Sequence, residues 1–169
     1  ASYDYFFHPQ FKDWLMFYQN GYAETTYYTY RMQLEGINSE KLIELCAPRL
    51  RTKIRTGLKE NASAISTNIT PEDFYKVYSK TFERQKTNMP VSLTAFLKIY
   101  GVLAKHNSMA LYSFEKHKGK PNAVLGVIYD NNAAYLVFNG FDATSENENA
   151  SALLIHHAMC EAAKRVAVF

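Results

Sequence analysis

The strongest constraint on the fold is a change of hydrophobic period near residue 109 of the 169-residue chain. From there apolar residues recur at every second position in three runs, Met109–Lys116, Ala123–Tyr129 and Ala133–Asn139. The runs are separated by residues 117–121 and 130–132, which are rich in Gly, Pro, Asp and Asn. Alternation interrupted by short turns predicts three antiparallel strands.

Helical spacing dominates on either side of these strands. Thr70-Pro71-Glu72-Asp73 combines a capping side chain, an early proline and first-turn acids, so it predicts a helix start. Further helices are expected over 92–106 and 148–165, and Val166–Phe169 is typical of the start of a strand. We therefore expect a mixed α/β (α+β) domain, with helices flanking antiparallel central strands and an open C-terminal end.

The first third of the chain predicts four further elements. Pro9 and apolar spacing favour a helix over 9–20, and alternation favours a strand over 24–34. Ser39 is expected to cap a helix interrupted at Pro48, and a second helix should follow over 49–61. Twelve of the 25 aromatic residues lie in 1–30, which is consistent with core packing or with a surface for stacking sugars or bases.

Composition excludes several classes of protein. With 47% hydrophobic and 21% charged residues, the chain is neither disordered nor fibrous. A net charge of +3 is too small to predict nucleic-acid binding by itself. Two cysteines form no disulfide framework, and no apolar run is long enough to span a bilayer, so we expect a soluble cytoplasmic protein.

The histidines and cysteines do not predict a metal site. His156 and His157 are neighbours on a helix and point about 100° apart, so they cannot chelate one ion together. Cys160 lies one turn beyond them. A Cys–His nucleophilic pair is one interpretation, and a packed helical cysteine is the other.

The most concentrated charge lies on the helix expected over 49–61. Leu50, Ile54 and Leu58 form its apolar stripe, and no acidic residue occurs between Arg49 and Lys59. Its five cations are Arg49, Arg51, Lys53, Arg55 and Lys59. This face is either simply solvated or a contact surface for the phosphates of a nucleotide-like donor, a tRNA or a lipid-linked acceptor.

A second potential anion site follows the last predicted strand. Asn139-Gly140-Phe141-Asp142 breaks the alternation, and the long helix begins after a polar loop, so that free N–H groups at a helix N-terminus lie beside strand ends. Glu146 and Glu148 stand where an anion would arrive, and their charge argues against tight anion binding there.

Several segments resemble a known family in their order and spacing. Leu50–Arg55 is similar to R-x-x-I-R-K, and Phe82-Glu83-Arg84-Gln85 to Y-E-R-Q. Asn139-Gly140-Phe141-Asp142 is similar to a G-G-x-D turn, and Asn149–Leu154 to G-A-T-S-L-L. Over about residues 24–169 the chain thus resembles the FemAB/FemX-like branch of the GNAT acyltransferase superfamily.

The resemblance implies transfer of an acyl or aminoacyl group to an amine acceptor, such as a peptidoglycan precursor. The donor would be acetyl-CoA, another acyl-CoA or an aminoacyl-tRNA, used as a co-substrate without a tightly bound cofactor. Asp142 and Tyr135 are the candidate catalytic side chains. Backbone groups would hold the donor, and basic side chains would contact phosphate. The donor-binding residues are Phe138, Asn139, Gly140, Asn149 and Ala150; the phosphate-binding residues are Arg51, Lys53, Arg55 and Lys59.

Two departures from the family pattern leave a second function open. Asn149 stands where relatives often have Gly, and Glu146 where they often have Arg, which weakens the case for CoA binding. The alternative is a non-catalytic GNAT-like module that binds a tRNA, a nucleotide-sugar or a lipid-linked precursor. The resemblance also implies missing sequence, so residues 1–35 are expected to end a preceding subdomain and 36–169 to form a partial GNAT-like domain.

Overall fold

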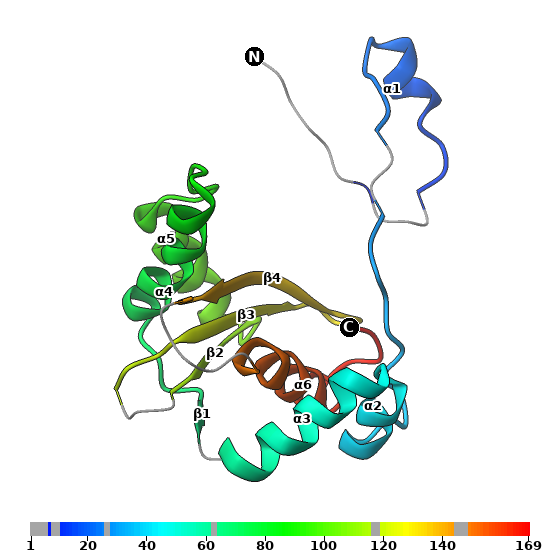
Figure 1. The fold of residues 1–169 in the computed structure, drawn as a ribbon. Helices are drawn as coiled ribbons and strands as arrows, with labels where there is room; N and C mark the ends of the chain where they lie inside the picture. The colour runs from blue at the N-terminus through cyan, green and yellow to red at the C-terminus, as the bar shows by residue number, and fades with distance from the viewer. Residues whose placement is uncertain (1–6, 8–10, 26–27, 62–63, 116–118, 144–148) are drawn as a thin grey trace. The chain divides into compact units, whose positions relative to one another are not determined.

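The computed structural model divides the chain into two compact units, Ala1–Tyr30 and Arg31–Phe169. It describes residues 7, 11–25, 28–61, 64–115, 119–143 and 149–169 (Figure 1). Leu34 is fully buried in the core of the larger unit, so the end of the predicted N-terminal segment packs with that unit. Among the described residues no helix combines the length and the apolarity needed to cross a membrane.

The first unit is organised by contacts between aromatic rings. Phe7 stacks on Phe11 with ring centroids 4.4 Å apart, and Phe17 lies 4.9 Å from Phe7. Helix α1 covers only Leu15–Gln19, although a helix over 9–20 was expected. The helix is short because it has no side-chain cap at Trp14 and buries none of its residues, so tertiary packing does not extend it.

The strand predicted over 24–34 is not formed in the described part of that segment. Tyr28 and Tyr30 are 94% and 101% exposed, and Gln33 makes an isolated bridge with Val168. Alternating side chains do not suffice for a strand, because each strand needs a partner backbone. Here backbone hydrogen bonds join Met32 to Phe169 and Leu34 to Ala167, so that pairing involves the C-terminal end of the predicted strand.

The larger unit is built on a four-stranded antiparallel sheet in the order β1-β2-β3-β4. Its strands are β1 (Ile65–Ser66), β2 (Met109–Phe114), β3 (Ala123–Tyr129) and β4 (Ala134–Phe141). The three alternating runs of the sequence therefore became neighbouring strands as predicted. The predicted C-terminal strand start is reduced to Val168, which bridges Gln33 and, in parallel direction, Ala133.

Helices cover both faces of the sheet (Figure 1). Helices α4 (Pro71–Gln85) and α5 (Leu93–Lys105) pack on one face, where Phe74, Phe96 and Phe138 meet. Helices α2 (Ser39–Leu45), α3 (Pro48–Asn61) and α6 (Ala150–Ala162) cover the other face. The central strands are apolar on both sides because both faces are covered.

Capping side chains fix where these helices begin. Thr70 Oγ1 accepts from the Asp73 N–H at 3.1 Å, with Pro71 at the first helical position, as expected. Ser92 accepts in the same way from Ala95. For α2 the predicted cap, Ser39, is wrong: Asn38 caps the helix by accepting from the Lys41 N–H at 2.9 Å, and Ser39 is the first helical residue.

Strand β4 lies unusually close to α4 at Gly140. A Cβ atom at Gly140 would be 2.5 Å from Tyr78 Cα and 2.9 Å from Val124 Cγ2. The first of these atoms belongs to the helix backbone, which cannot move aside as a side chain can. Only glycine therefore allows this strand-to-helix distance.

We predict that Gly140→Ala destabilises the protein by about 1–3 kcal/mol or more, because it overpacks the α4–β4 contact. Gly101→Ala is the matched control: this position lies on α5, is exposed, and has no atom within 4 Å of the added Cβ. There alanine should stabilise by up to about 1 kcal/mol through helix propensity. Urea unfolding measures both. Equal stability of the two variants would contradict the close contact.

Candidate functional site

Strand β4 is the edge of the sheet and carries a bulge in its middle. Val127 pairs with Leu136 and Gly126 pairs with Phe138, so Val137 is an extra residue on β4. A bulge bends its strand and disturbs the hydrogen-bond ladder, and bulges are frequent beside active sites. A ligand-binding site on this edge of the sheet is therefore expected at the bulge around Val137.

The bulge determines which backbone amides face the open edge. At the two ends of β4, the Ala134 N–H donates to the Val168 carbonyl at 2.8 Å and the Phe141 N–H donates to Thr81 Oγ1 at 3.0 Å. Amide directions alternate along a strand, and the bulge adds one residue to that alternation. Between the two bonded ends, the outward amides are thus those of Leu136 and Asn139.

The same alternation shows which of the three strand residues predicted to bind the acyl donor direct their backbone amide to the open edge. Asn139 presents its backbone to the open edge, whereas the amides of Phe138 and Gly140 turn toward β3. Beside the outward amides, Tyr135, Leu136 and Val137 are 45%, 38% and 47% exposed. Amide donors flanked by apolar side chains suit an extended ligand with carbonyl oxygens, which can add to the edge like a further strand.

Asp142 follows β4 directly and is held by helix α4. Its Oδ2 lies 2.5 Å from Lys80 Nζ, and its side chain is only 16% exposed. Its backbone N–H donates to the Asn122 carbonyl at 2.8 Å. Together with Thr81, Lys80 therefore fixes the end of β4. Sequence analysis missed both residues, because nothing in the spacing of α4 shows that they reach a strand about 60 residues later in the chain.

Tyr135, the other predicted catalytic side chain, lies at the opposite end of β4. Its hydroxyl donates to Asp130 Oδ2 at 2.8 Å, and this hydrogen bond raises the pKa of the phenol. Six residues of extended strand lie between Tyr135 and Asp142, which places the two residues about 20 Å apart. The two side chains therefore do not share one reacting group. A raised pKa keeps Tyr135 protonated at neutral pH, so that it can donate a proton but is a poor base.

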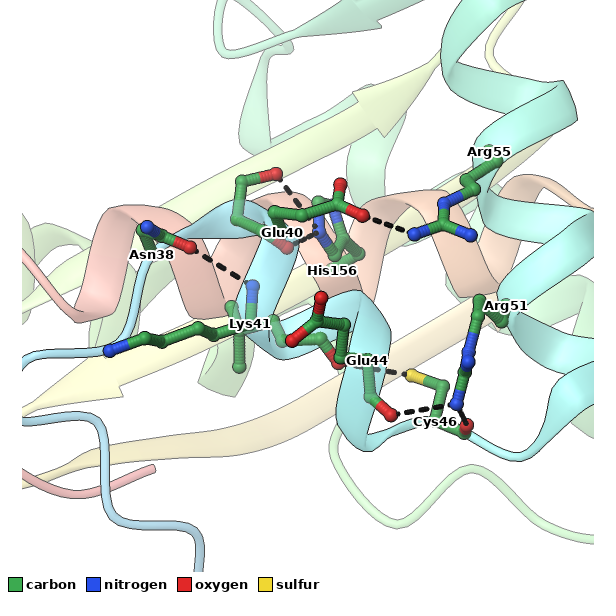
Figure 2. Close-up of polar contacts among 10 residues, drawn as sticks. Asn38, Glu40, Lys41, Glu44, Cys46, Arg51, Arg55 and His156 are labelled. Carbon is green, nitrogen blue, oxygen red and sulfur yellow. Dashed lines mark hydrogen bonds and ion pairs between the residues drawn. The ribbon is translucent and has the colours of Figure 1, made fainter.

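Two of the α3 residues that were predicted to contact phosphate, Arg51 and Arg55, bind groups of helix α2 in the structure (Figure 2). The half-buried Arg51 donates through Nη2 to the carbonyls of Glu44 at 2.9 Å and Cys46 at 3.3 Å, at the C-terminal end of α2. Arg55 forms an ion pair with Glu40. The Arg55 side chain is 50% exposed and the Glu40 side chain is 58% exposed. Exposed pairs of this kind contribute only about 0–1 kcal/mol.

The other basic residues of α3 differ in exposure. Arg49 and Lys59 are exposed, whereas Lys53 is half-buried. The predicted solvated or phosphate-binding face is thus divided: Arg51 stabilises the end of α2, and Arg49, Arg55 and Lys59 point outward. At the start of α6, Asn149 accepts from the Leu153 N–H at 3.0 Å and Ala150 is buried; Glu146 and Glu148 lie outside the described residues.

The Cys–His pair considered from sequence is brought together on α6. Cys160 Sγ lies 3.8 Å from His156 Nε2, and the same nitrogen lies 3.3 Å from Ser39 Oγ. Burial raises the pKa of the Cys160 thiol, and His156 is itself buried. A reactive cysteine needs a lowered pKa and access to solvent, so this geometry favours a packed cysteine.

A family model described as an acetyltransferase (GNAT) domain matches residues 48–167. The chain belongs to this family. The matched segment runs from the start of α3 through the sheet to the end of α6, so it includes the open edge of β4 and the basic face of α3. Most of the larger unit is accordingly a GNAT-type domain.

Solved structures agree with this fold. The chain is similar to the crystal structure of FemX, with a TM-score of 0.69, 10% identity, and coverage of 82% of this chain and 50% of that one. It is also similar to a conserved protein of unknown function from Bacteroides thetaiotaomicron, with a TM-score of 0.54, 11% identity, and coverage of 82% and 48%. No curated protein matches the sequence. The chain spans about half the length of these proteins.

The family and the fold together confirm two predictions. The resemblance to FemX-like GNAT proteins is confirmed, and so is the mixed α/β fold with antiparallel central strands flanked by helices. At 10% and 11% identity the structural likeness concerns the fold alone.

We predict that Cys160 is unreactive. Because its pKa is raised, its thiolate fraction at pH 7–8 should be below that of a free cysteine, and reaction with a disulfide reagent should be slower than for glutathione. The measurement uses the Cys46→Ser variant, so that Cys160 is the only thiol, and follows the rate from pH 6 to pH 10. A rate midpoint below that of glutathione would instead support an activated Cys–His pair.

Proposed function

We propose that this chain is part of an enzyme that transfers an acyl or aminoacyl group from a CoA thioester or an aminoacyl-tRNA to an amine, with a cell-wall precursor as the candidate acceptor. The observation that carries this proposal is the open, bulged edge of β4 within a GNAT domain. There the outward amides of Leu136 and Asn139 can bind the carbonyl oxygens of an extended donor.

In the proposed reaction the acceptor amine attacks the carbonyl carbon of the bound donor. The tetrahedral intermediate collapses as the C–S or C–O bond breaks, an amide forms, and the thiol or ribose hydroxyl leaves with a proton. Backbone N–H groups at the bulge would stabilise the oxyanion, because they are fixed before the reaction begins. Positioning by the strand supplies much of the remaining acceleration.

The candidate catalytic side chains would act separately in this scheme. Tyr135 is protonated and exposed, so it can give a proton to the leaving group. Asp142 would accept the proton of the amine only if the Lys80 ammonium moved away, since that ammonium neutralises the carboxylate. Phosphates of the donor or acceptor would contact the outward cations of α3 and the N-terminus of α6 near Asn149 and Ala150.

A non-catalytic GNAT-like module that binds a phosphate-bearing ligand is the alternative. The observation that favours it is that both candidate catalytic side chains already hold the fold: Asp142 binds Lys80 and Tyr135 binds Asp130. Such a module would bind a tRNA, a nucleotide-sugar or a lipid-linked precursor through the same basic surface. It would show ligand binding without turnover.

The first experiment titrates the protein with acetyl-CoA and with an aminoacyl-tRNA by calorimetry, at low and moderate salt. Asn139→Pro tests the role of the edge, because proline removes the outward amide and is tolerated on an edge strand where that amide faces away from the ladder. Asn139→Ala is the matched control, since it shortens the same side chain and keeps the amide.

We expect donor binding to fall by about three- to tenfold in Asn139→Pro and to be nearly unchanged in Asn139→Ala, because one hydrogen bond between an amide and a carbonyl oxygen contributes about 0.5–1.5 kcal/mol. Saturable CoA binding would support acyl-CoA as the donor, and salt-dependent tRNA binding alone would support the aminoacyl-tRNA. Binding without product formation would favour the module. No binding of either titrant would contradict the transferase and a tRNA-binding module alike.

A further inference from the structure

The ion pair between Glu40 and Arg55 is the one contact that joins the basic face of α3 to an acidic side chain of α2 in Figure 2. The two side chains come from different helices and meet at the surface, 58% and 50% exposed. A carboxylate at this position has two effects on an approaching anion. It occupies the guanidinium of Arg55 and it repels the anion itself.

This pair is not what holds α2 in place. Leu42 and Ile43 are 3% and 2% exposed, so α2 is anchored by burial of its apolar face. Arg51 binds the carbonyls at the end of α2, and Ser39 contacts His156 of α6. Opening the Glu40–Arg55 pair therefore leaves these anchors intact, whereas withdrawing Arg51 would expose the carbonyls that it satisfies.

A phosphate and a carboxylate compete for the same fork of guanidinium N–H groups. Arg49 and Lys59 lie about 15 Å apart along the axis of α3. Arg55 lies between them along this axis, and a phosphate could replace Glu40 as its partner. We propose that Glu40 is a specificity-determining residue, which weakens phosphate binding on α3 so that ligands with many phosphates are favoured over ligands with one or two. This inference rests on the proposed phosphate contact of α3.

The test compares Glu40→Gln with Glu44→Gln. Both changes remove one negative charge from α2, and Glu44 is an exposed residue one turn further along, so that general electrostatic effects are matched. The probes are inorganic pyrophosphate and an RNA hairpin of acceptor-stem length without an aminoacyl group. Binding is measured from 50 to 200 mM salt, and urea unfolding checks that each variant is folded.

We expect Glu40→Gln to bind the hairpin about threefold or more tightly at low salt, and its slope of log affinity against log salt to steepen by about 0.9, as for one additional phosphate contact on a duplex. The relative gain should be larger for pyrophosphate, because it has fewer alternative contacts. Glu44→Gln should change affinity by much less, and Glu40→Gln combined with Arg55→Gln should lose the gain.

Two results would overturn the inference and are distinguishable. If Lys59→Gln weakens binding but Glu40→Gln behaves like Glu44→Gln, α3 contacts phosphate and Glu40 does not control it. If neither probe binds wild type or Glu40→Gln, the phosphate contact of α3 fails together with the inference. The Asn139 variants test a different contact, the backbone amide of β4 with the donor, so a loss of donor binding in Asn139→Pro would support the proposed function even where either of these results is found.

Discussion

The contact between β4 and α4 is the constraint on which the candidate site depends. Gly140 allows the strand to approach the helix backbone at Tyr78, and Thr81 and Lys80 bind the strand end. The bulge at Val137 then directs Phe138 into the aromatic core between the sheet and α4. Because one end of β4 is fixed in this way and the other is joined to Val168, the outward amides of Leu136 and Asn139 are left facing the open edge.

Much of the fold could be predicted from local patterns. Alternation gave β2, β3 and β4, and capping chemistry gave the start of α4, because both depend on neighbouring residues. The strand expected over 24–34 is not formed for the opposite reason: pairing depends on a distant backbone, and among the described residues of this segment only 32–34 find one. The bulge at Val137 could not be predicted, because one extra residue changes few positions in a short alternating run. The end predicted at Asn139 was placed there by the break in alternation that follows, and β4 continues through it to Phe141.

The elements that carry the candidate site could be located from the sequence, since strand β4 and the basic helix α3 both show in residue type and spacing. The donor-binding and phosphate-binding roles of their residues came from the family resemblance and stay predictions. The sequence could not show that Lys80 reaches Asp142, or that Asp130 reaches Tyr135, because these contacts are made by the folded chain. The two side chains chosen as catalytic consequently turned out to lie at opposite ends of one strand.

The number of basic residues on α3 overstates how many of them are available to a ligand, because two of the five already bind groups of α2. Arg51 is a tertiary cap for α2, and its burial makes it part of the fold. Arg55 is exposed but paired, so its charge is released only to a ligand that displaces Glu40. In this chain, then, the carbonyls and the carboxylate of α2 bind two of the five cations of α3, and the packing of α2 against α6 keeps these partners in place. The proposed phosphate contact therefore depends on α2 as well as on α3.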